Sequence, residues 1–160
     1  MKHISWDDYF MGVALLSAKR SKDPRTKVGA CIVNTEKRIV GVGYNGMPYG
    51  CDDNEFPWGS DGDDLDTKYL YVVHAELNAI LNATENLKNC SIYIALFPCN
   101  ECCKAIIQSG IKKIIYLSDK YHDTDSVIGG KKMLDAAGVK YEQLQTGVDD
   151  LTINFDASKI

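Results

Sequence analysis

An amphipathic segment opens the chain. Between Ser5 and about Lys19, apolar or small residues recur one helical turn apart, which predicts a helix. The residues that share this face are Phe10, Val13, Ala14 and Ser17. Ser5 and Asp8 have the spacing of a capping-box variant, so we expect the helix to begin at Ser5 and to end before Pro24.

Two short apolar segments rich in β-branched residues follow this helix. Residues 28–33 and 39–44 are separated by the polar residues 34–38, a pattern that predicts an antiparallel hairpin. Glycines punctuate the next stretch, but their spacing does not fit a dinucleotide-binding fingerprint. We interpret this stretch as a strand end that turns into a binding loop with Asn45 at its tip.

The second half of the chain alternates between extended and helical patterns. The extended apolar runs are residues 70–73, 92–96, 113–117 and 139–144, and the helical segments follow His74, follow Pro98 and span residues 128–137. Strands that alternate with helices pair in parallel through right-handed crossovers. The pattern therefore predicts an α/β fold, a mixed sheet with helices on both faces and parallel later strands.

Residues 51–66 show no periodicity. The segment is acidic and contains glycine, and Phe56, Pro57 and Trp58 lie at its centre. One interpretation is a solvated surface loop. The other is a lid or a subunit contact anchored by Trp58.

Length and composition indicate one intracellular domain. The 160 residues suit a single core, so we expect one domain over residues 1–160. No apolar stretch is long enough to span a bilayer, and the first residues lack the apolar core of a signal peptide. Cys31 and Cys90 lie in or beside apolar runs, where a reduced thiol acts as a small hydrophobic group. We expect a cytoplasmic protein with no membrane partner.

The formal net charge of −4 argues against a polynucleotide as the main partner, because binding many phosphates needs a basic face. A small anion needs only a local basic patch. Residues 19–27 provide one, and the candidate phosphate-binding or allosteric residues in it are Lys19, Arg20, Lys22 and Arg25. A solvated helix end whose cations complement the helix dipole is an equal alternative.

The candidate chemistry lies in the sequences His-Ala-Glu and Pro-Cys-Asn-Glu-Cys. The first contains His74 and Glu76, and the second contains Cys99 and Cys102. One imidazole and two thiolates give zinc three protein ligands and leave the fourth tetrahedral position for water, whereas structural zinc sites fill all four. Glu76 is then the expected proton carrier. The order and spacing match the signature of zinc-dependent nucleobase deaminases.

Each half of this signature has a more common explanation when it stands alone. A C-x-x-C pair is more often a redox pair or half of a structural zinc site, and a histidine before a helix is more often a polar cap. Together, each ahead of a predicted helix, they favour a catalytic site, because N–H groups at both helix starts would stabilise thiolates. Cys103 is the nearest competing ligand, but on a helix it points about 100° away from Cys102. We interpret Cys103 as a packing residue.

Six segments, two of which contain the zinc signature, together match the sequence pattern of one protein family. They are residues 20–24, 28–33, 43–48, 74–80, 97–102 and 118–123. In this order they resemble the cytidine/deoxycytidylate deaminase family, and within it the dCMP deaminases. The resemblance implies a three-layer αβα fold around a mixed sheet of about five strands. It also implies hydrolysis of dCMP to dUMP with release of ammonia, which supplies dUMP for thymidylate synthesis.

The resemblance implies further properties. Members of the family usually form hexamers, and they are commonly activated by dCTP, which Mg²⁺ can accompany, and inhibited by dTTP. The backbone of Ala75 would contact the pyrimidine, and Asn45 would hydrogen-bond the sugar. Lys120 and Tyr121 follow the predicted strand near Ser118 and are our candidates for the 5′-phosphate. For Tyr121, packing at a subunit contact is an equal alternative.

Two other functions are compatible with the zinc signature. The first is deamination of another cytosine nucleotide, a free nucleoside or base, or adenosine in tRNA, although the acidic net charge argues against tRNA. The second is a catalytically silent binding or assembly module stabilised by zinc. Glu76 argues against the module, because a structural zinc site has no need for a carboxylate there.

Overall fold

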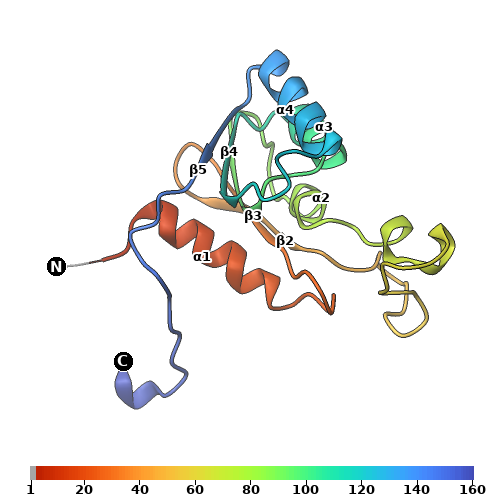
Figure 1. The fold of residues 1–160 in the computed structure, drawn as a ribbon. Helices are drawn as coiled ribbons and strands as arrows, with labels where there is room; N and C mark the ends of the chain where they lie inside the picture. The colour runs from red at the N-terminus through yellow and green to blue at the C-terminus, as the bar shows by residue number, and fades with distance from the viewer. Residues whose placement is uncertain (1–2) are drawn as a thin grey trace.

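A five-stranded sheet in the order β2-β1-β3-β4-β5 forms the centre of the protein, in a computed structural model that describes residues 3–160 (Figure 1). Residues 1–2 of the predicted domain lie outside the described part. The strands are β1 (Gly29–Val33), β2 (Ile39–Tyr44), β3 (Ser91–Leu96), β4 (Lys113–Ser118) and β5 (Lys140–Gln143). The α-helices are α1 (Trp6–Ala18), α2 (Ala75–Leu81), α3 (Asn100–Ser109) and α4 (Asp125–Ala137).

The sheet is mixed, as the sequence predicts. Strand β1 pairs antiparallel with both neighbours, placing Gly29 opposite Tyr44 in β2 and Ala30 opposite Ile94 in β3. Strands β3, β4 and β5 are parallel, because α3 and α4 return the chain between them. The carboxyl ends of β3 and β4 therefore meet at one edge of the sheet, the edge at which open α/β sheets bind ligands.

Helices cover both faces of the sheet (Figure 1). Helix α1 packs on one face, where the buried residues are Phe10, Met11, Ala14, Cys31, Val33, Tyr93 and Ile115. Helices α2, α3 and α4 cover the other face over a larger cluster that includes Ala79, Ile92, Ile106, Ile114 and Leu134. Three layers result, and their two cores explain why the central strands are apolar on both sides.

Glycine in β2 brings α2 close to the sheet. A Cβ atom on Gly43 would lie 2.3 Å from the backbone nitrogen of Ala79, and one on Gly41 would lie 2.6 Å from its carbonyl oxygen. No side chain fits between this strand and the helix. The close contact places the start of α2 beside the end of β2.

The predicted strand at residues 70–73 is wrong. Residues Lys68–Leu70 form a 3₁₀ turn, and within the run 70–73 only Val73 forms a bridge, an isolated one to Gly46 outside the strands. The carbonyl oxygen of Lys68 accepts from the N–H groups of Tyr71 and Val72, which curls the chain instead of extending it. The first half of the zinc signature therefore follows a turn, and only the second half follows a strand.

Two other boundaries differ slightly from those predicted. Helix α4 begins at Asp125 instead of residue 128, because the hydroxyl of Thr124 caps it by accepting from the N–H of Val127. The last strand covers Lys140–Gln143 and is shorter than the predicted run. Neither difference changes the topology.

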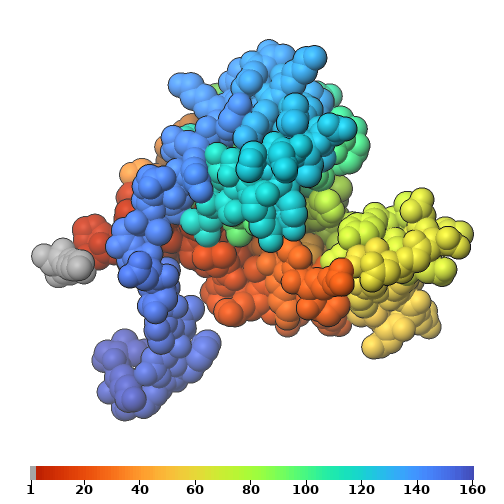
Figure 2. Space-filling view, in the orientation of Figure 1, coloured from red at the N-terminus to blue at the C-terminus, as the bar shows by residue number. Residues whose placement is uncertain are grey.

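The start of α1 is joined to the segment after β5. Ser5 caps the helix as predicted, its Oγ accepting from the N–H of Asp8 at 3.0 Å. The Asp8 carboxylate also accepts from the Thr146 hydroxyl at 2.7 Å and from the Gly147 N–H at 3.4 Å. Beyond this clamp, residues 148–160 project from the body of the molecule (Figure 2).

No helix within residues 3–160 is both long enough and apolar enough to cross a bilayer.

Candidate active site

Two helix N-caps bring the three predicted ligands together. His74 is the N-cap residue of α2, and Cys99 is the N-cap residue of α3, where its Sγ accepts from the N–H of Cys102 at 3.5 Å. The Nδ1 atom of His74 lies 3.4 Å from the Sγ atom of Cys99 and 3.4 Å from that of Cys102. All three ligand atoms lie within 4.8 Å of one another.

These distances fit zinc. With Zn–N of about 2.0–2.1 Å and Zn–S of about 2.3 Å, a tetrahedral angle separates the nitrogen and sulfur atoms by about 3.6 Å. The observed 3.4 Å for both nitrogen–sulfur pairs is close to this separation. Among residues 3–160 this is the one such group of His, Cys, Asp and Glu side chains. Three donors leave a coordination position for water.

The protonation of the two thiols also suits a metal. The Cys102 thiol and the His74 ring donate to the sulfur of Cys99 and lower the pKa of Cys99 to about 4, although burial opposes the shift. The same pairing, together with burial, raises the pKa of Cys102. Both sulfurs bind zinc as thiolates, so metal binding would release the protons that the thiols carry.

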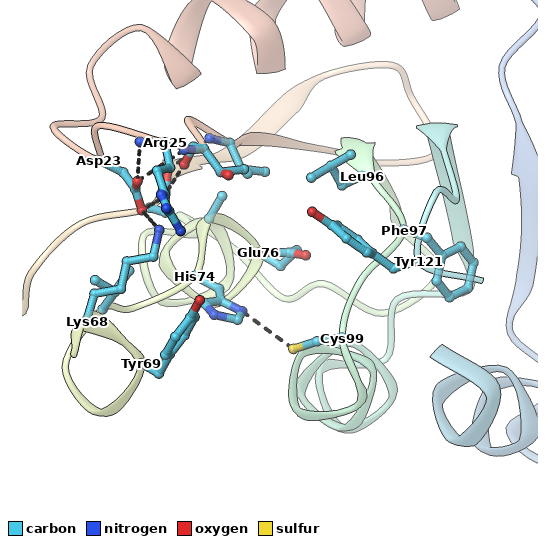
Figure 3. Close-up of a pocket in the computed structure, with 15 residues that line it drawn as sticks. Asp23, Arg25, Lys68, Tyr69, His74, Glu76, Leu96, Phe97, Cys99 and Tyr121 are labelled. Carbon is cyan, nitrogen blue, oxygen red and sulfur yellow. Dashed lines mark hydrogen bonds and ion pairs between the residues drawn. The ribbon is translucent and has the colours of Figure 1, made fainter. Parts of the chain in front are cut away.

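Glu76 follows His74 by two residues, and its carboxylate is buried. It lies in the first turn of α2, is 5% exposed and points into the cavity beside His74 (Figure 3). Burial raises the pKa of Glu76. A carboxyl group with a raised pKa can both accept and return a proton near neutral pH.

A cavity of about 540 Å³ opens over these residues, within the range of about 300–1,000 Å³ that is usual for small-molecule sites. The side chains around it come from both halves of the chain (Figure 3). They are Asp23, Arg25, Thr26, Val28, Asn45, Lys68, Tyr69, Val72, His74, Ala75, Glu76, Leu96, Phe97, Cys99 and Tyr121. One wall is charged and the opposite wall is apolar and aromatic.

Three of the four predicted substrate residues line this cavity: Ala75, Tyr121 and Asn45. Ala75 is the first residue of α2, where a backbone N–H has no partner within its own helix. Tyr121 is 49% exposed and points into the cavity. Lys120 is not among the cavity-lining residues; its Nζ atom lies 5.0 Å from the centre of the Tyr121 ring, so its direct contact is with Tyr121.

Asn45 also lines the cavity, but the predicted loop tip is wrong. The residue directly follows β2 and is 6% exposed. Its Oδ1 atom accepts from the N–H of Val28 at 2.9 Å, and its Nδ2 atom donates to the carbonyl of Thr26 at 2.9 Å. Asn45 therefore shapes the wall formed by residues 23–28.

One of the four candidates in the basic segment reaches the cavity. Arg25 lines it. Lys22 forms an ion pair with Asp53 at the surface, and Lys19 and Arg20 are exposed and do not line the cavity. The basic segment thus divides into one cavity residue and three surface residues.

The acidic segment 51–66 packs beside the cavity. The indole Nε1 atom of Trp58 donates to the carbonyl of Asp53 at 2.9 Å, so Trp58 holds the segment together internally. Asp53 pairs with Lys22, and the hydroxyl of Ser60 accepts from the guanidinium of Arg25. These contacts tie the segment to residues 22–25.

Sequence reasoning missed the ion pair between Asp23 and Lys68. Its two side chains are 2% and 11% exposed, and their charged atoms lie 2.5 Å apart. The signal available was weak: an aspartate before a proline is a common turn residue, and a lysine after an acidic loop is a common surface residue. Only the fold brings these residues together across 45 positions of the chain.

Cys103 packs as predicted. It is fully buried and points at Gly130 of α4, where a Cβ atom would lie 2.8 Å from its sulfur. The six cysteines are all free thiols, and Cys31 and Cys90 are buried in the two cores.

The comparison with known families decides the assignment. The model of the cytidine and deoxycytidylate deaminase zinc-binding region matches residues 4–118. The chain belongs to the cytidine and deoxycytidylate deaminase family. The recognition of this family from six short segments is thereby confirmed.

Individual members of the family match over most of the chain. Deoxycytidylate deaminase of Homo sapiens is 54% identical over 157 residues, which are 97% of this chain and 88% of the relative. The probable deoxycytidylate deaminase of Drosophila melanogaster is 52% identical over 162 residues, covering 97% of this chain and 80% of the relative.

A solved member of the family has the same fold. The structure of dCMP deaminase from the cyanophage S-TIM5 in complex with dCMP and dUMP matches with a TM-score of 0.69 and 27% identity, covering 89% of this chain and 100% of that chain. The predicted three-layer αβα fold with five strands is confirmed.

Proposed function

We propose that the protein is a zinc-dependent deaminase that hydrolyses dCMP to dUMP and ammonia. The observation that carries the proposal is the buried Glu76 carboxylate beside a three-donor metal group in a cavity large enough for a nucleotide. Membership of the family supports it, as do the names of the relatives with 54% and 52% identity. We propose that residues 1–160 form one functional domain.

His74, Cys99 and Cys102 are the proposed zinc ligands. When bound, zinc would supply Lewis acidity that lowers the pKa of water to about 7. Glu76 accepts a proton from the attacking water and delivers it to N3 of the pyrimidine as C4 is attacked. It then accepts the remaining proton from the hydroxyl group on C4 and passes it to the amino group, which leaves as ammonia as the C4 carbonyl forms. One carboxyl group serves as base and then as acid, and its burial suits both roles.

The remaining substrate contacts are assigned by position. The N–H of Ala75 is available for the pyrimidine edge. Asn45 contacts the sugar or holds the wall that does, and Tyr121 closes the opposite side of the cavity. Lys120 acts by holding the Tyr121 ring.

Assembly, regulation and location form a second part of the proposal. We propose a cytoplasmic hexamer that dCTP activates, with Mg²⁺ accompanying the effector, and that dTTP inhibits. The support is the family resemblance together with Lys19, Arg20 and Lys22, which lie outside the cavity at the surface. Light scattering tests the hexamer, and added effectors in the activity assay test the regulation.

The test of the reaction is ammonia release by the zinc-loaded protein with dCMP, CMP, deoxycytidine and dCTP in parallel. We expect turnover largely confined to dCMP. Equal turnover of deoxycytidine would contradict specificity for the monophosphate. Bound zinc with no turnover of any of the four would instead favour a catalytically silent zinc-stabilised module.

A further inference from the structure

Lys68 lies in an unusual position for a lysine. It lines the cavity, its residue exposure is only 9%, and its Nζ atom donates to Oδ2 of Asp23. Lysine is rarely buried to this degree unless it is paired. An ammonium group has three N–H donors, and Asp23 is the one hydrogen-bond acceptor recorded for it within residues 3–160. Two donors are therefore left for a ligand in the cavity.

Asp23 holds this lysine in a fixed place. Its Oδ1 atom accepts from the N–H groups of Arg25 at 2.9 Å and Thr26 at 3.1 Å, and its Oδ2 atom accepts from Lys68 at 2.5 Å and Asn45 at 3.4 Å. Burial works against the charged carboxylate, but these hydrogen bonds lower the pKa of Asp23 overall. The carboxylate stays ionised and orients the ammonium group.

The backbone of Lys68 is equally constrained. Its N–H donates to the carbonyl of Gly59 at 2.9 Å, and its carbonyl accepts from Tyr71 and Val72. The segment 51–66 thus supports the turn that carries the lysine. A buried ion pair contributes little net stability, because desolvation of the two charges offsets their attraction. Stability alone therefore gives little reason to keep this pair in the wall of a cavity.

The charges on this wall favour an anion. Asp23 balances one positive charge, while Lys68 and Arg25 supply two, so the wall carries one net positive charge. A phosphate monoester carries a charge of about −1.5 to −2 at pH 7 and accepts several charge-assisted hydrogen bonds. The opposite wall, formed by Leu96, Phe97 and Tyr121, offers apolar and aromatic surface instead (Figure 3).

We infer that Lys68, oriented by Asp23 and assisted by Arg25, binds the 5′-phosphate and makes the site select a nucleoside monophosphate over the nucleoside. The inference deepens the proposed function and rests on it. It moves phosphate recognition from Lys120, whose direct contact is the ring of Tyr121, to the charged wall opposite. It also gives the acidic segment 51–66 a role as the support of that wall.

The test compares dCMP with deoxycytidine as substrates of zinc-loaded wild type and of Lys68→Met. We expect kcat/KM for dCMP to fall about 10- to 100-fold, mainly through KM, as loss of a charge-assisted hydrogen bond predicts. For deoxycytidine kcat/KM should stay within about threefold, because no phosphate contact is lost. Lys68→Arg should recover most of the dCMP activity, and Arg25→Met should give a smaller loss confined to dCMP.

The matched control is Lys113→Met, which removes a lysine paired with Glu142 at 2.8 Å on the sheet and should leave both substrates unchanged. If Lys68→Met does not fold, Asp23→Asn combined with Lys68→Met removes both charges and avoids a buried unpaired carboxylate. An equal loss for both substrates in the folded variants would overturn the inference and leave Lys68 a structural residue.

Binding of the products separates this inference from the proposed reaction. Calorimetry with dUMP and deoxyuridine requires no turnover. If wild type deaminates nothing but binds dUMP more tightly than deoxyuridine, and Lys68→Met abolishes that preference, the proposed reaction fails and the phosphate site stands. If wild type deaminates dCMP and Lys68→Met keeps the full preference for the monophosphate, the reaction stands and the inference fails.

Discussion

The Nδ1 atom of His74 lies 3.4 Å from the Sγ atom of Cys99, although 25 residues separate them. Each residue occupies the N-cap position of a different helix, α2 or α3, and both helices pack on the same face of the sheet. The metal group therefore depends on the packing of two helix starts as much as on the identity of its donors.

Removal of one donor should abolish zinc binding. Cys99→Ala leaves one imidazole and one thiolate, too few to hold zinc in a catalytic site. We expect zinc content, measured by mass spectrometry, to fall from about one per chain to near zero, together with deaminase activity. Cys51→Ala removes a free thiol outside the cavity and should change neither. Full zinc content in Cys99→Ala would exclude Cys99 as a ligand.

Replacement of the proton carrier should separate chemistry from metal binding. Glu76→Gln keeps the shape of the side chain but cannot accept and return a proton, so kcat should fall about 100- to 10,000-fold. Zinc content and the melting temperature should stay near wild type. The control is Glu101→Gln at the start of α3, whose exposed carboxylate pairs with Lys104. Retained turnover in a zinc-loaded Glu76→Gln protein would rule out Glu76 as the proton carrier.

Two adjacent glycines in α4 should respond in opposite ways to alanine. A Cβ atom on Gly130 would lie 2.8 Å from the sulfur of buried Cys103, so Gly130→Ala should lower the free energy of unfolding by about 1–3 kcal/mol. Gly129 has open space around the same position, so Gly129→Ala should raise it by about 0.5–1 kcal/mol. Urea denaturation measures both values.

A double-mutant cycle checks the reason for the Gly130 effect. Cys103→Ala removes the sulfur that the new methyl group would meet, so adding Gly130→Ala to it should cost less than in wild type. Equal costs in the two backgrounds would show that the contact with Cys103 is not the cause.

The clamp between α1 and the C-terminal segment should weaken in acid. The Thr146 hydroxyl, the Ser5 hydroxyl and the Gly147 N–H all donate to Asp8 and lower its pKa in the folded protein, although burial opposes them. A carboxylate with a lowered folded pKa contributes stability above its unfolded pKa of about 3.9 and loses it as the pH falls through the folded value.

Comparison of Asp8→Asn with wild type isolates this contribution. At neutral pH we expect the variant to be less stable by about 1 kcal/mol, because a charge-assisted acceptor becomes neutral. The difference should begin to shrink below about pH 4, as the unfolded chain is protonated, and should disappear once the pH falls below the lowered folded pKa of Asp8. Asp150→Asn, in the exposed C-terminal segment, is the control and should show no such dependence. A difference that persists unchanged at low pH would reject the electrostatic explanation.

Local patterns in the chain determined the elements and the donor set. Period-3.6 spacing predicted α1, short β-branched runs predicted the hairpin of β1 and β2, and the two cysteines, one histidine and one glutamate predicted the metal chemistry. Each of these depends on neighbouring residues, whose spacing the sequence shows directly. The run 70–73 is ambiguous because it is short and apolar, and the hydrogen bonds to the carbonyl of Lys68 curl it into a turn.

Only the tertiary structure decided which distant residues share the cavity. The pairing of Lys68 with Asp23 spans 45 positions, and no periodicity marks it. The same is true of the division of the basic segment, in which Arg25 reaches the cavity while Lys22 pairs with Asp53 at the surface. The physical reason is that periodic spacing reports which face of an element is apolar, whereas the partner of a buried charge is set by how separate elements pack.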